Sequence, residues 1–266
     1  MIQLGIIDLA LAAGLVLALA FVTRLRRLGI AKDLVVAASR MTIQLLLVGL
    51  VLRALFAHAA PFWIGVMTLV MLVMAGYEIR ARQRRRLRGG WGYGVGVGSV
   101  FISSFGVTAI ALLFVVQPLP WYAPQYLVPI LGMILGKTMS GVALALDRVT
   151  QGAWQGRELI EQRLMLGQDR REATSDLRRD AVRTAMIPII NAMAIAGVVS
   201  LPGSMTGQIL AGSPPFEAVK YQVLIMLFAA ASSGTGVLMA VWLGVRRLFD
   251  ERSRLRLDHL AGDREL

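Results

Sequence analysis

The sequence predicts an all-α, polytopic integral membrane protein with about seven transmembrane helices. Hydrophobic residues make up 56% of its 266 residues and the mean hydropathy is +0.65, which is too apolar for a typical soluble domain. Most apolar stretches approach the ~20 residues that a helix needs to cross the hydrocarbon of a bilayer, where the backbone must satisfy its own hydrogen bonds. The predicted spans are 3–23, 34–57, 62–77, 95–116, 124–147, 186–211 and 219–244.

The basic residues predict how these spans are oriented. Of the 28 Lys and Arg, 24 lie in four segments, which follow the first, third, fifth and seventh spans. The connections around 58–61, 117–124 and 213–218 contain none. By the positive-inside rule, the N-terminus lies outside and the C-terminus in the cytoplasm. The net charge of +12 is therefore interpreted as a topology signal with contacts to anionic membrane lipid, and no nucleic-acid partner is expected.

Two regions are expected. Residues 1–245 form the transmembrane domain, which includes a cytoplasmic loop at 148–184, and residues 246–266 form a short, basic, frayed cytoplasmic tail. The absence of cysteine excludes disulfides, thiolate metal sites and a cysteine nucleophile. No catalytic motif is present, so the chain is not expected to be an enzyme. The glycine-rich run 92–98 lacks the Gly-Lys-Ser/Thr of a phosphate loop, and it is expected to begin the fourth span and permit close helix packing.

The loop 148–184 is expected to contain two short helices separated by a break. The first covers 157–166, and Gly167 stands where a helix commonly ends in a left-handed glycine. Asp169 followed by Glu172 resembles a capping box that opens the second helix. The apolar residues of the first helix are expected on one side: Leu159, Ile160, Leu164 and Met165. Such an element is suited to docking a soluble partner, but a solvated connection explains the composition equally well.

Two predicted spans contain irregular features. In the sixth, the Pro202-Gly203 pair is expected to break the helix and open its backbone toward a cavity, although a simple helix exit at Leu201 is the alternative. In the fifth, Gly132, Gly136 and Ser140 recur every four residues. This small-residue face is expected to pack closely, within the bundle or across a dimer.

Polar residues inside predicted spans are candidates for a translocation path, because polar groups in a membrane usually face a cavity or a partner. No cluster of carboxylates or other strong ligands indicates a metal site, so the metal ligands stay unknown. The methionines in the spans are more typical of packing than of soft-metal binding. The candidate path residues are Arg40, Gln44, Lys137 and Asn191, together with Pro202, Gly203 and Met205 at the expected helix break. The alternative for Arg40, near the cytoplasmic end of its span, is that its side chain extends to the membrane surface.

Three segments resemble the FetB-type family of ABC transporter permeases, which is associated with iron export and has plant relatives linked to aluminium tolerance. The first segment is 40–45 with Gly49, and the second is 129–139. The third runs from Leu166 to Gln222, and its part from Ser200 onward is the most specific. Lys137 stands where the family usually has Asn, and Ser204 where it often has Met.

The resemblance implies a permease subunit of the inner (plasma) membrane that exports a metal ion, is driven by a separate ATPase subunit, and works as a homodimer. This chain would need no cofactor, and ATP with Mg²⁺ would bind the partner. The alternatives that the residues leave open are a stand-alone secondary transporter and a non-transport membrane scaffold. The residues expected to couple this chain to the ATPase are Glu161, Gly167, Asp169, Glu172, Arg179, Asp180 and Arg183.

Overall fold

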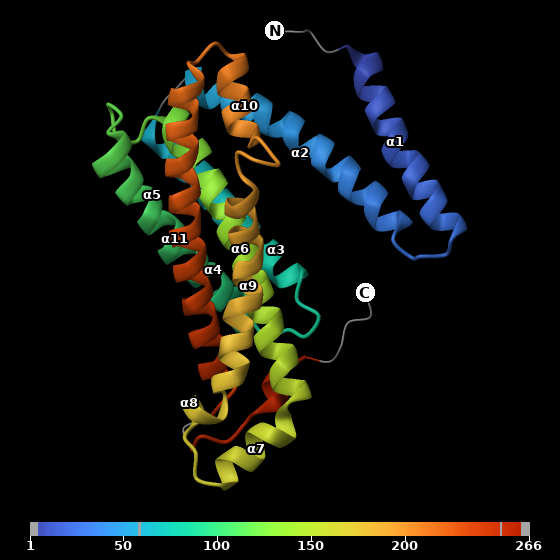
Figure 1. The fold of residues 1–266 in the computed structure, drawn as a ribbon, viewed down its shortest axis with the longest axis vertical. Coiled ribbons are helices and arrows are strands. Elements are labelled where there is room, and N and C mark those ends of the chain that lie inside the picture. The colour runs from blue at the N-terminus through green and yellow to red at the C-terminus, as the bar shows by residue number, and fades with distance from the viewer. Residues whose placement is uncertain (1–4, 58–59, 251, 262–266) are drawn as a thin grey trace. The chain divides into compact units, whose positions relative to one another are not determined.

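The computed structural model describes residues 5–57, 60–250 and 252–261, and this described part is mainly α-helical (Figure 1). Residues 58–59 of the second connection and Arg264 of the predicted tail lie outside the described residues. The long helices are α1 (Ile6–Leu25), α2 (Ala31–Ala57), α3 (Pro61–Ala81), α6 (Pro124–Gln155), α9 (Ser175–Ile195) and α11 (Pro215–Arg247). The shorter ones are α4 (Trp91–Val100), α5 (Gly106–Ile110), α7 (Arg157–Met165), α8 (Arg170–Ala173) and α10 (Gly203–Leu210).

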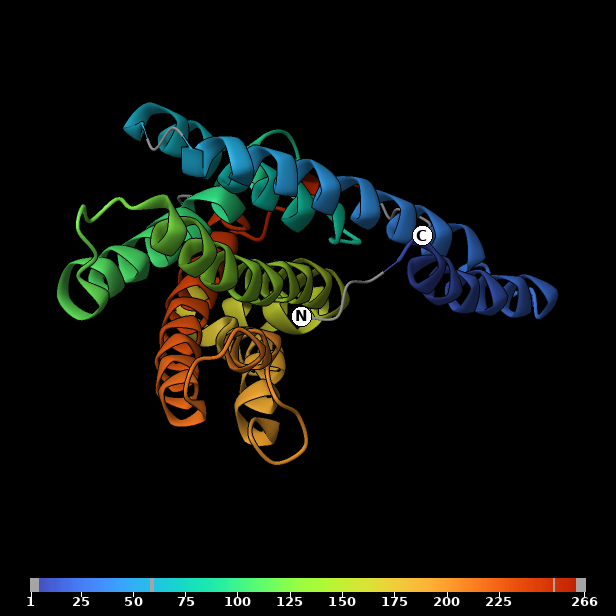
Figure 2. The same ribbon diagram turned by 90° about the horizontal axis from the view of Figure 1, so that it is seen from above.

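The chain forms two units. Residues 1–60 contain α1 and α2, which pack against each other as a helical hairpin. Residues 61–266 contain the other helices. Within the second unit α6 is the central element, because it packs against α3, α4, α9 and α11 (Figure 2). Its buried face consists of aliphatic and small side chains, including Ile130, Ile134, Val142 and Leu146.

Among the described residues, six helices are long and apolar enough to cross a membrane, and the polytopic membrane class is confirmed. They correspond to all the predicted spans except the sixth, with α4, η1 (Phe101–Phe105), α5 and η2 (Ala111–Val116) together forming the fourth. η1 and η2 are π-helical. π-helical segments are rare in proteins, and those that occur are often found at functional sites. Several spans are longer than predicted, since α6 continues as a helix to Gln155 through polar residues.

The predicted sixth span is not one continuous helix. α9 ends at Ile195, a non-helical connection follows, and α10 begins at Gly203. Gly197 in this connection has a φ of +81°, a left-handed conformation that favours glycine. The helix is interrupted as expected, although it already ends at Ile195, and residues 203–210, which the alternative assigned to an outer loop, form a short helix.

Glycines permit the close packing of α3 on α4, as the glycine run 92–98 predicted. A Cβ atom on Gly96 would lie 3.0 Å from Cγ2 of Ile79, whose side chain is fully buried. A Cβ atom on Gly76 would lie 2.2 Å from Cγ2 of Val97. Larger residues at either position would push the two helices apart.

Hydroxyl groups connect the helices near the middle of the second unit. Ser232 of α11 lies 2.7 Å from Thr138 of α6 and 3.3 Å from Ser104 of η1, measured between the hydroxyl oxygens. All three side chains are fully buried. Hydroxyl pairs of this kind hold helices together where the surrounding lipid offers no hydrophobic driving force.

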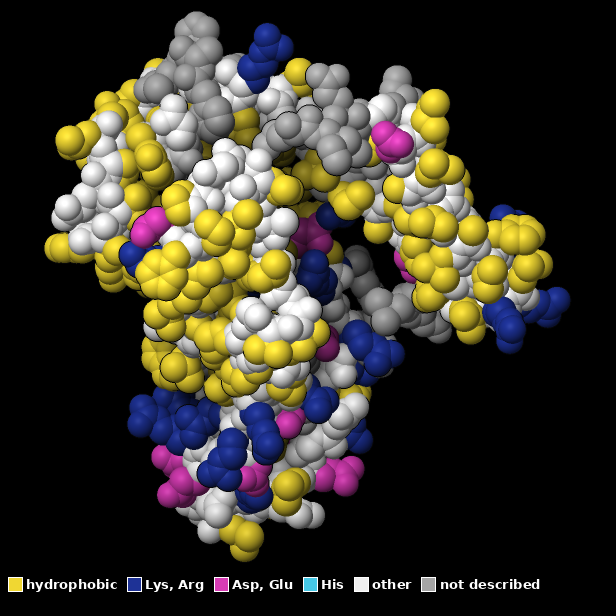
Figure 3. Space-filling view, turned by 45° about the horizontal axis from the view of Figure 1, so that its top comes forward, with side chains coloured by type: hydrophobic (Ala, Val, Ile, Leu, Met, Phe, Trp, Pro, Cys, Tyr) yellow, Lys and Arg dark blue, Asp and Glu magenta, His cyan; other side chains and the backbone are white. Residues whose placement is uncertain are grey.

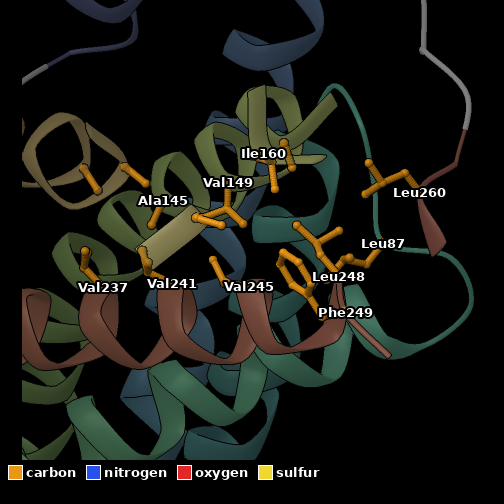
Figure 4. Packing of buried hydrophobic residues seen from close by; sticks show 14 residues of the cluster. Leu87, Ala145, Val149, Ile160, Val237, Val241, Val245, Leu248, Phe249 and Leu260 are labelled. Atoms are coloured by element: carbon orange, nitrogen blue, oxygen red, sulfur yellow. The ribbon is translucent and has the colours of Figure 1, made fainter. Parts of the chain in front are cut away.

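The tail after α11 is ordered over its described residues, contrary to the expectation of fraying. Leu248, Phe249 and Leu260 are buried in one cluster with Leu87 of the α3–α4 connection, Val149 of α6 and Ile160 of α7 (Figure 4). The backbone N–H of Arg88 donates to the carbonyl of His259 at 2.7 Å, and that of Ala261 donates to Arg86 at 2.8 Å. The expectation failed because the leucines spaced between the arginines find a common apolar surface.

Candidate functional site

The helical elbow, which we define as residues 157–173 (α7, the turn at Gly167 and α8), has the predicted glycine turn and capping box. Gly167 follows α7 with a φ of +87°, a conformation that is costly for residues with a Cβ atom. The backbone N–H of Glu172 donates to Oδ1 of Asp169 at 2.7 Å, and the backbone N–H of Asp169 donates to Oε2 of Glu172 at 3.3 Å. The capping box is therefore confirmed, although the second helix is interrupted at Thr174 before α9 begins.

Buried and charged contacts fix the elbow to the bundle. Ile160 is 4% exposed within the core cluster shown in Figure 4. Nη2 of Arg163 donates to Oδ2 of Asp176 on α9 at 2.6 Å, and Nη1 reaches the carbonyl of Ala173 at 3.5 Å. The hydrogen bond from Arg163 lowers the pKa of Asp176 below its ordinary value. These contacts join α7 to α9, so a force on the elbow is transmitted to a long helix.

The tip of the elbow is apolar and exposed, which the sequence analysis missed. Met165 is 78% exposed and Leu166 is 82% exposed. The expected one-sided apolar face of α7 is wrong, because Ile160 and Leu164 pack inward whereas Leu159 and Met165 face away from the core. The position of Met165 and Leu166 directly before a left-handed glycine was the available signal. Met165 and Leu166 therefore form a small exposed apolar tip on a fixed turn.

The seven predicted coupling residues divide into three groups. Gly167, Asp169 and Glu172 shape the elbow itself. Asp180 of α9 forms an ion pair with Arg148 of α6, in which Oδ2 of Asp180 lies 3.2 Å from Nε of Arg148. The remaining three have exposed side chains, on α7 and along α9: Glu161, Arg179 and Arg183.

The structure brings together only some of the candidate path residues. A Cβ atom on Gly141 of α6 would lie 3.5 Å from the carbonyl oxygen of Ala185 on α9. α6 and α9 pack against each other. Lys137 lies one turn along α6 from Gly141, and Asn191 lies less than two turns along α9 from Ala185, both toward the same end of this helix pair. Both are exposed and at a similar level. Arg40 and Gln44 are exposed on α2, in the other unit.

The other three candidate path residues lie where the helix resumes as α10, after the interruption in the predicted sixth span. Pro202 immediately precedes α10, Gly203 is the first residue of that helix, and Met205 is half-buried. The hydroxyl of Ser204 donates to Oε1 of Gln222 on α11, whose side chain is buried. This hydrogen bond attaches α10 to α11, so Ser204 has a clear structural role at a position where the resembled family often has Met.

Within the 61–266 unit, the described residues leave the small-residue face of α6 largely uncovered. A Cβ atom on Gly132 would lie 3.3 Å from Cε of Met71, but one on Gly136 would meet no described atom within 4 Å. Ser140 is half-buried and donates its hydroxyl to the carbonyl of Gly136 at 3.1 Å. Gly136 and Lys137 are both exposed, so this stripe carries a charge beside its small residues.

No group of three or more His, Cys, Asp and Glu residues converges anywhere in the described part of the chain. The candidate path residues offer two amides (Gln44 and Asn191), one thioether (Met205) and two cationic groups (Arg40 and Lys137) instead. None of them is a carboxylate, an imidazole or a thiolate, which are the groups that usually hold a resident metal ion.

The whole helical framework matches one family model. The uncharacterised protein family UPF0014 aligns with residues 6–249, which include the elbow, the broken sixth span and α11. The chain belongs to this family. Among its relatives, a UPF0014 membrane protein of Synechocystis is 33% identical over 96% of this chain and 98% of its own length.

Two further relatives carry informative names. The probable iron export permease protein FetB of Escherichia coli is 29% identical over 95% of each chain. Protein ALUMINUM SENSITIVE 3 of Arabidopsis thaliana is 26% identical over 97% of this chain and 93% of its own. No solved structure matches. The chain is therefore similar to one protein named for iron export and to another named for aluminium sensitivity.

Proposed function

We propose that this chain is the membrane permease subunit of an ABC transporter that exports metal ions across the inner (plasma) membrane. The observation that carries the proposal is the elbow, a rigid helical turn that is fixed to α9 and presents Met165 and Leu166 outward. The chain has no phosphate loop of its own, so the energy source would bind elsewhere. A groove on a separate ATPase subunit would receive the elbow tip.

The direction and cargo of transport are inferred from the relatives. One relative is named for iron export, while another is named for aluminium sensitivity. A family of metal exporters accounts for both names. Lys137 adds a positive charge to the path of this chain at a position where the resembled family has Asn, so we expect its metal preference to differ from that of Asn-containing relatives.

The proposed mechanism is alternating access. ATP binding closes the ATPase dimer, which pulls on the elbow of each permease chain. The Arg163–Asp176 contact passes the movement to α9. α9 then rocks relative to α6, and the non-helical connection between Ile195 and Gly203 absorbs the change while the Gly132/Gly136 face repacks.

A pull-down from mild detergent tests the docking step. The tagged wild-type chain is expected to recover a small Walker-motif ATPase, and the Met165→Asp/Leu166→Asp double variant is expected to recover little of it. The Gln162→Asp/Gln168→Asp double variant is the matched control, because it adds the same two negative charges at exposed positions on either side of the tip. Recovery of the chain alone, with metal transport into vesicles that needs no ATP, would establish the secondary-transporter alternative instead.

Gly167 provides a test of coupling that leaves the tip intact. Gly167→Val should be strained at a φ of +87° by about 1–2 kcal/mol, whereas Gly167→Asn should be tolerated better because asparagine adopts this conformation more readily. We expect the valine variant to hydrolyse ATP with little transport in proteoliposomes, and the asparagine variant to stay coupled. Full coupling in the valine variant would contradict a role for this turn.

A further inference from the structure

A second cluster at the elbow end of the molecule consists of arginines without carboxylate partners. Arg170 and Arg171 of α8, Arg178 of α9 and Arg246 of α11 surround a cavity of about 200 Å³ together with Thr174 and Trp242. None of these four arginines forms an ion pair with a described carboxylate, and no Asp or Glu lines the cavity. Figure 3 shows that Lys and Arg side chains gather at this end of the second unit, below a largely hydrophobic surface.

One guanidinium is held in place with part of its hydrogen-bonding capacity unused. Nη2 of Arg178 donates to the carbonyl of Arg171 at 2.8 Å, which fixes the plane of the side chain. Nε of Arg178 is buried and has no hydrogen-bond partner among the described residues. A buried charged donor without a partner is costly, and an anion in the cavity would remove that cost.

The position of the cavity along α11 indicates where such an anion would come from. Leu238, Trp242 and Arg246 follow one another at intervals of one turn on an exposed face of this helix. The guanidinium carbon of Arg246 lies 5.5 Å from the centre of the Trp242 ring. A progression from leucine through tryptophan to arginine is typical of a helix that leaves the hydrocarbon and enters the headgroup layer.

We infer that this cavity binds the headgroup of an anionic phospholipid, whose phosphate charge is not balanced by a choline cation, and so links α8 and α9 to α11. Arginine forms strong, often bidentate hydrogen bonds to phosphate, and four of them supply the charge. A soluble phosphate has the same chemistry, but the Leu238–Trp242–Arg246 face favours the lipid. The inference concerns lipid binding only and stands whether or not the proposed transport function is correct.

The experiment measures lipid binding to the purified full-length protein by native mass spectrometry and thermal shift. Phosphatidylglycerol is expected to bind and stabilise the wild type, while phosphatidylcholine and inorganic phosphate are not. The Arg171→Gln/Arg178→Gln double variant is expected to bind phosphatidylglycerol about 30-fold more weakly, for two interfacial charges removed. Arg252→Gln is the control, because it removes an exposed arginine at the same end without touching the cavity.

Three results would overturn the inference. Equal binding of phosphatidylglycerol and phosphatidylcholine would show that headgroup charge is not recognised. An equal stabilisation by inorganic phosphate would identify a site for a soluble anion. Unchanged lipid binding in the double variant, with loss of a co-purifying protein, would show that the arginines serve a protein partner. Circular dichroism and elution volume confirm that each variant is folded before its binding is compared.

Discussion

At the scale of single residues, Gly236 and Gly234 on α11 offer a matched test of the helix packing. A Cβ atom on Gly236 would lie 2.8 Å from both Oγ of Ser103 and Cγ2 of Thr138, whose side chains are buried. Gly236→Ala is therefore expected to destabilise the protein by about 1–3 kcal/mol through overpacking. A Cβ atom on Gly234 would meet only Cε of Met186, at 3.7 Å.

Gly234→Ala is the control for that prediction. It should be neutral or stabilising by up to about 1 kcal/mol, because alanine has the higher helix propensity. Reversible unfolding in mixed micelles measures both free energies. Equal effects of the two substitutions would show that α11 does not approach η1 and α6 as closely as the structure indicates.

Single residues also show where sequence reasoning succeeded and where it could not. Gly167 and the Asp169–Glu172 pair were predictable, because a left-handed glycine and a capping box depend only on near neighbours in the chain. The pairing of Ser232 with Thr138 was not, because it depends on which faces of distant helices meet. The same limit applies to the arginine-lined cavity, whose members come from three helices.

At the scale of elements, the link between α7 and α9 should depend on pH. Hydrogen bonding to Arg163 lowers the pKa of Asp176 from its ordinary value of 3.8, so the carboxylate is charged in the folded state at neutral pH. The stabilisation from this link is fully present above the ordinary pKa and is lost as the pH falls through the lowered one. Hydrogen exchange of the 157–165 amides between about pH 6 and pH 3 measures it.

We expect protection of these amides, corrected for the intrinsic exchange rate, to fall at the acidic end in the wild type. In Asp176→Asn the protection should be lower at neutral pH and nearly independent of pH, because the titrating group is gone. A wild type and a variant with the same pH dependence would mean that another group controls the attachment of α7.

Element boundaries show which part of the fold the sequence could indicate. The apolar spans were predictable because every crossing helix must satisfy its backbone and face lipid. The ends were not, since α6 continues through Asp147 and Arg148 to Gln155 with its polar side chains bonded to other elements, such as Asp147 to the backbone N–H of Arg84. The order of the tail was mispredicted for a related reason. Its many arginines indicated an exposed segment, whereas the leucines between them pack against the bundle.

At the scale of the whole molecule, the uncovered stripe of α6 predicts a dimer. Gly136 and Ser140 lie on a face where the other described residues of the 61–266 unit leave room for another helix, and the exposed Lys137 beside them would be costly against lipid alone. Because the chain has no cysteine, Gly136→Cys or Ser140→Cys introduces a single thiol. Mild oxidation in membranes is expected to cross-link these variants into covalent dimers.

Leu238→Cys is the control for the cross-linking, because Leu238 is exposed on α11 and belongs to the proposed lipid-facing surface. It should remain monomeric on a denaturing gel. Gly136→Leu should weaken dimer association, because the larger side chain prevents the close approach that small residues allow between membrane helices. Analytical ultracentrifugation in detergent measures this loss of dimer. Cross-linking of Leu238→Cys with none at positions 136 and 140 would place the dimer contact on a different helix.

The closure of the tail over the α3–α4 connection sets an order of events during synthesis. Residues that meet there, such as Arg88 and Asp258, are separated by 170 positions in the chain. At about 5–20 residues per second, the ribosome needs on the order of ten to thirty seconds to supply the second partner after the first has emerged. Until then Leu87 has no tail leucine to cover it. A nascent chain stalled before Leu248 would leave this apolar cluster incomplete, so the packing around Leu87 can be finished only when nearly the whole chain has been made.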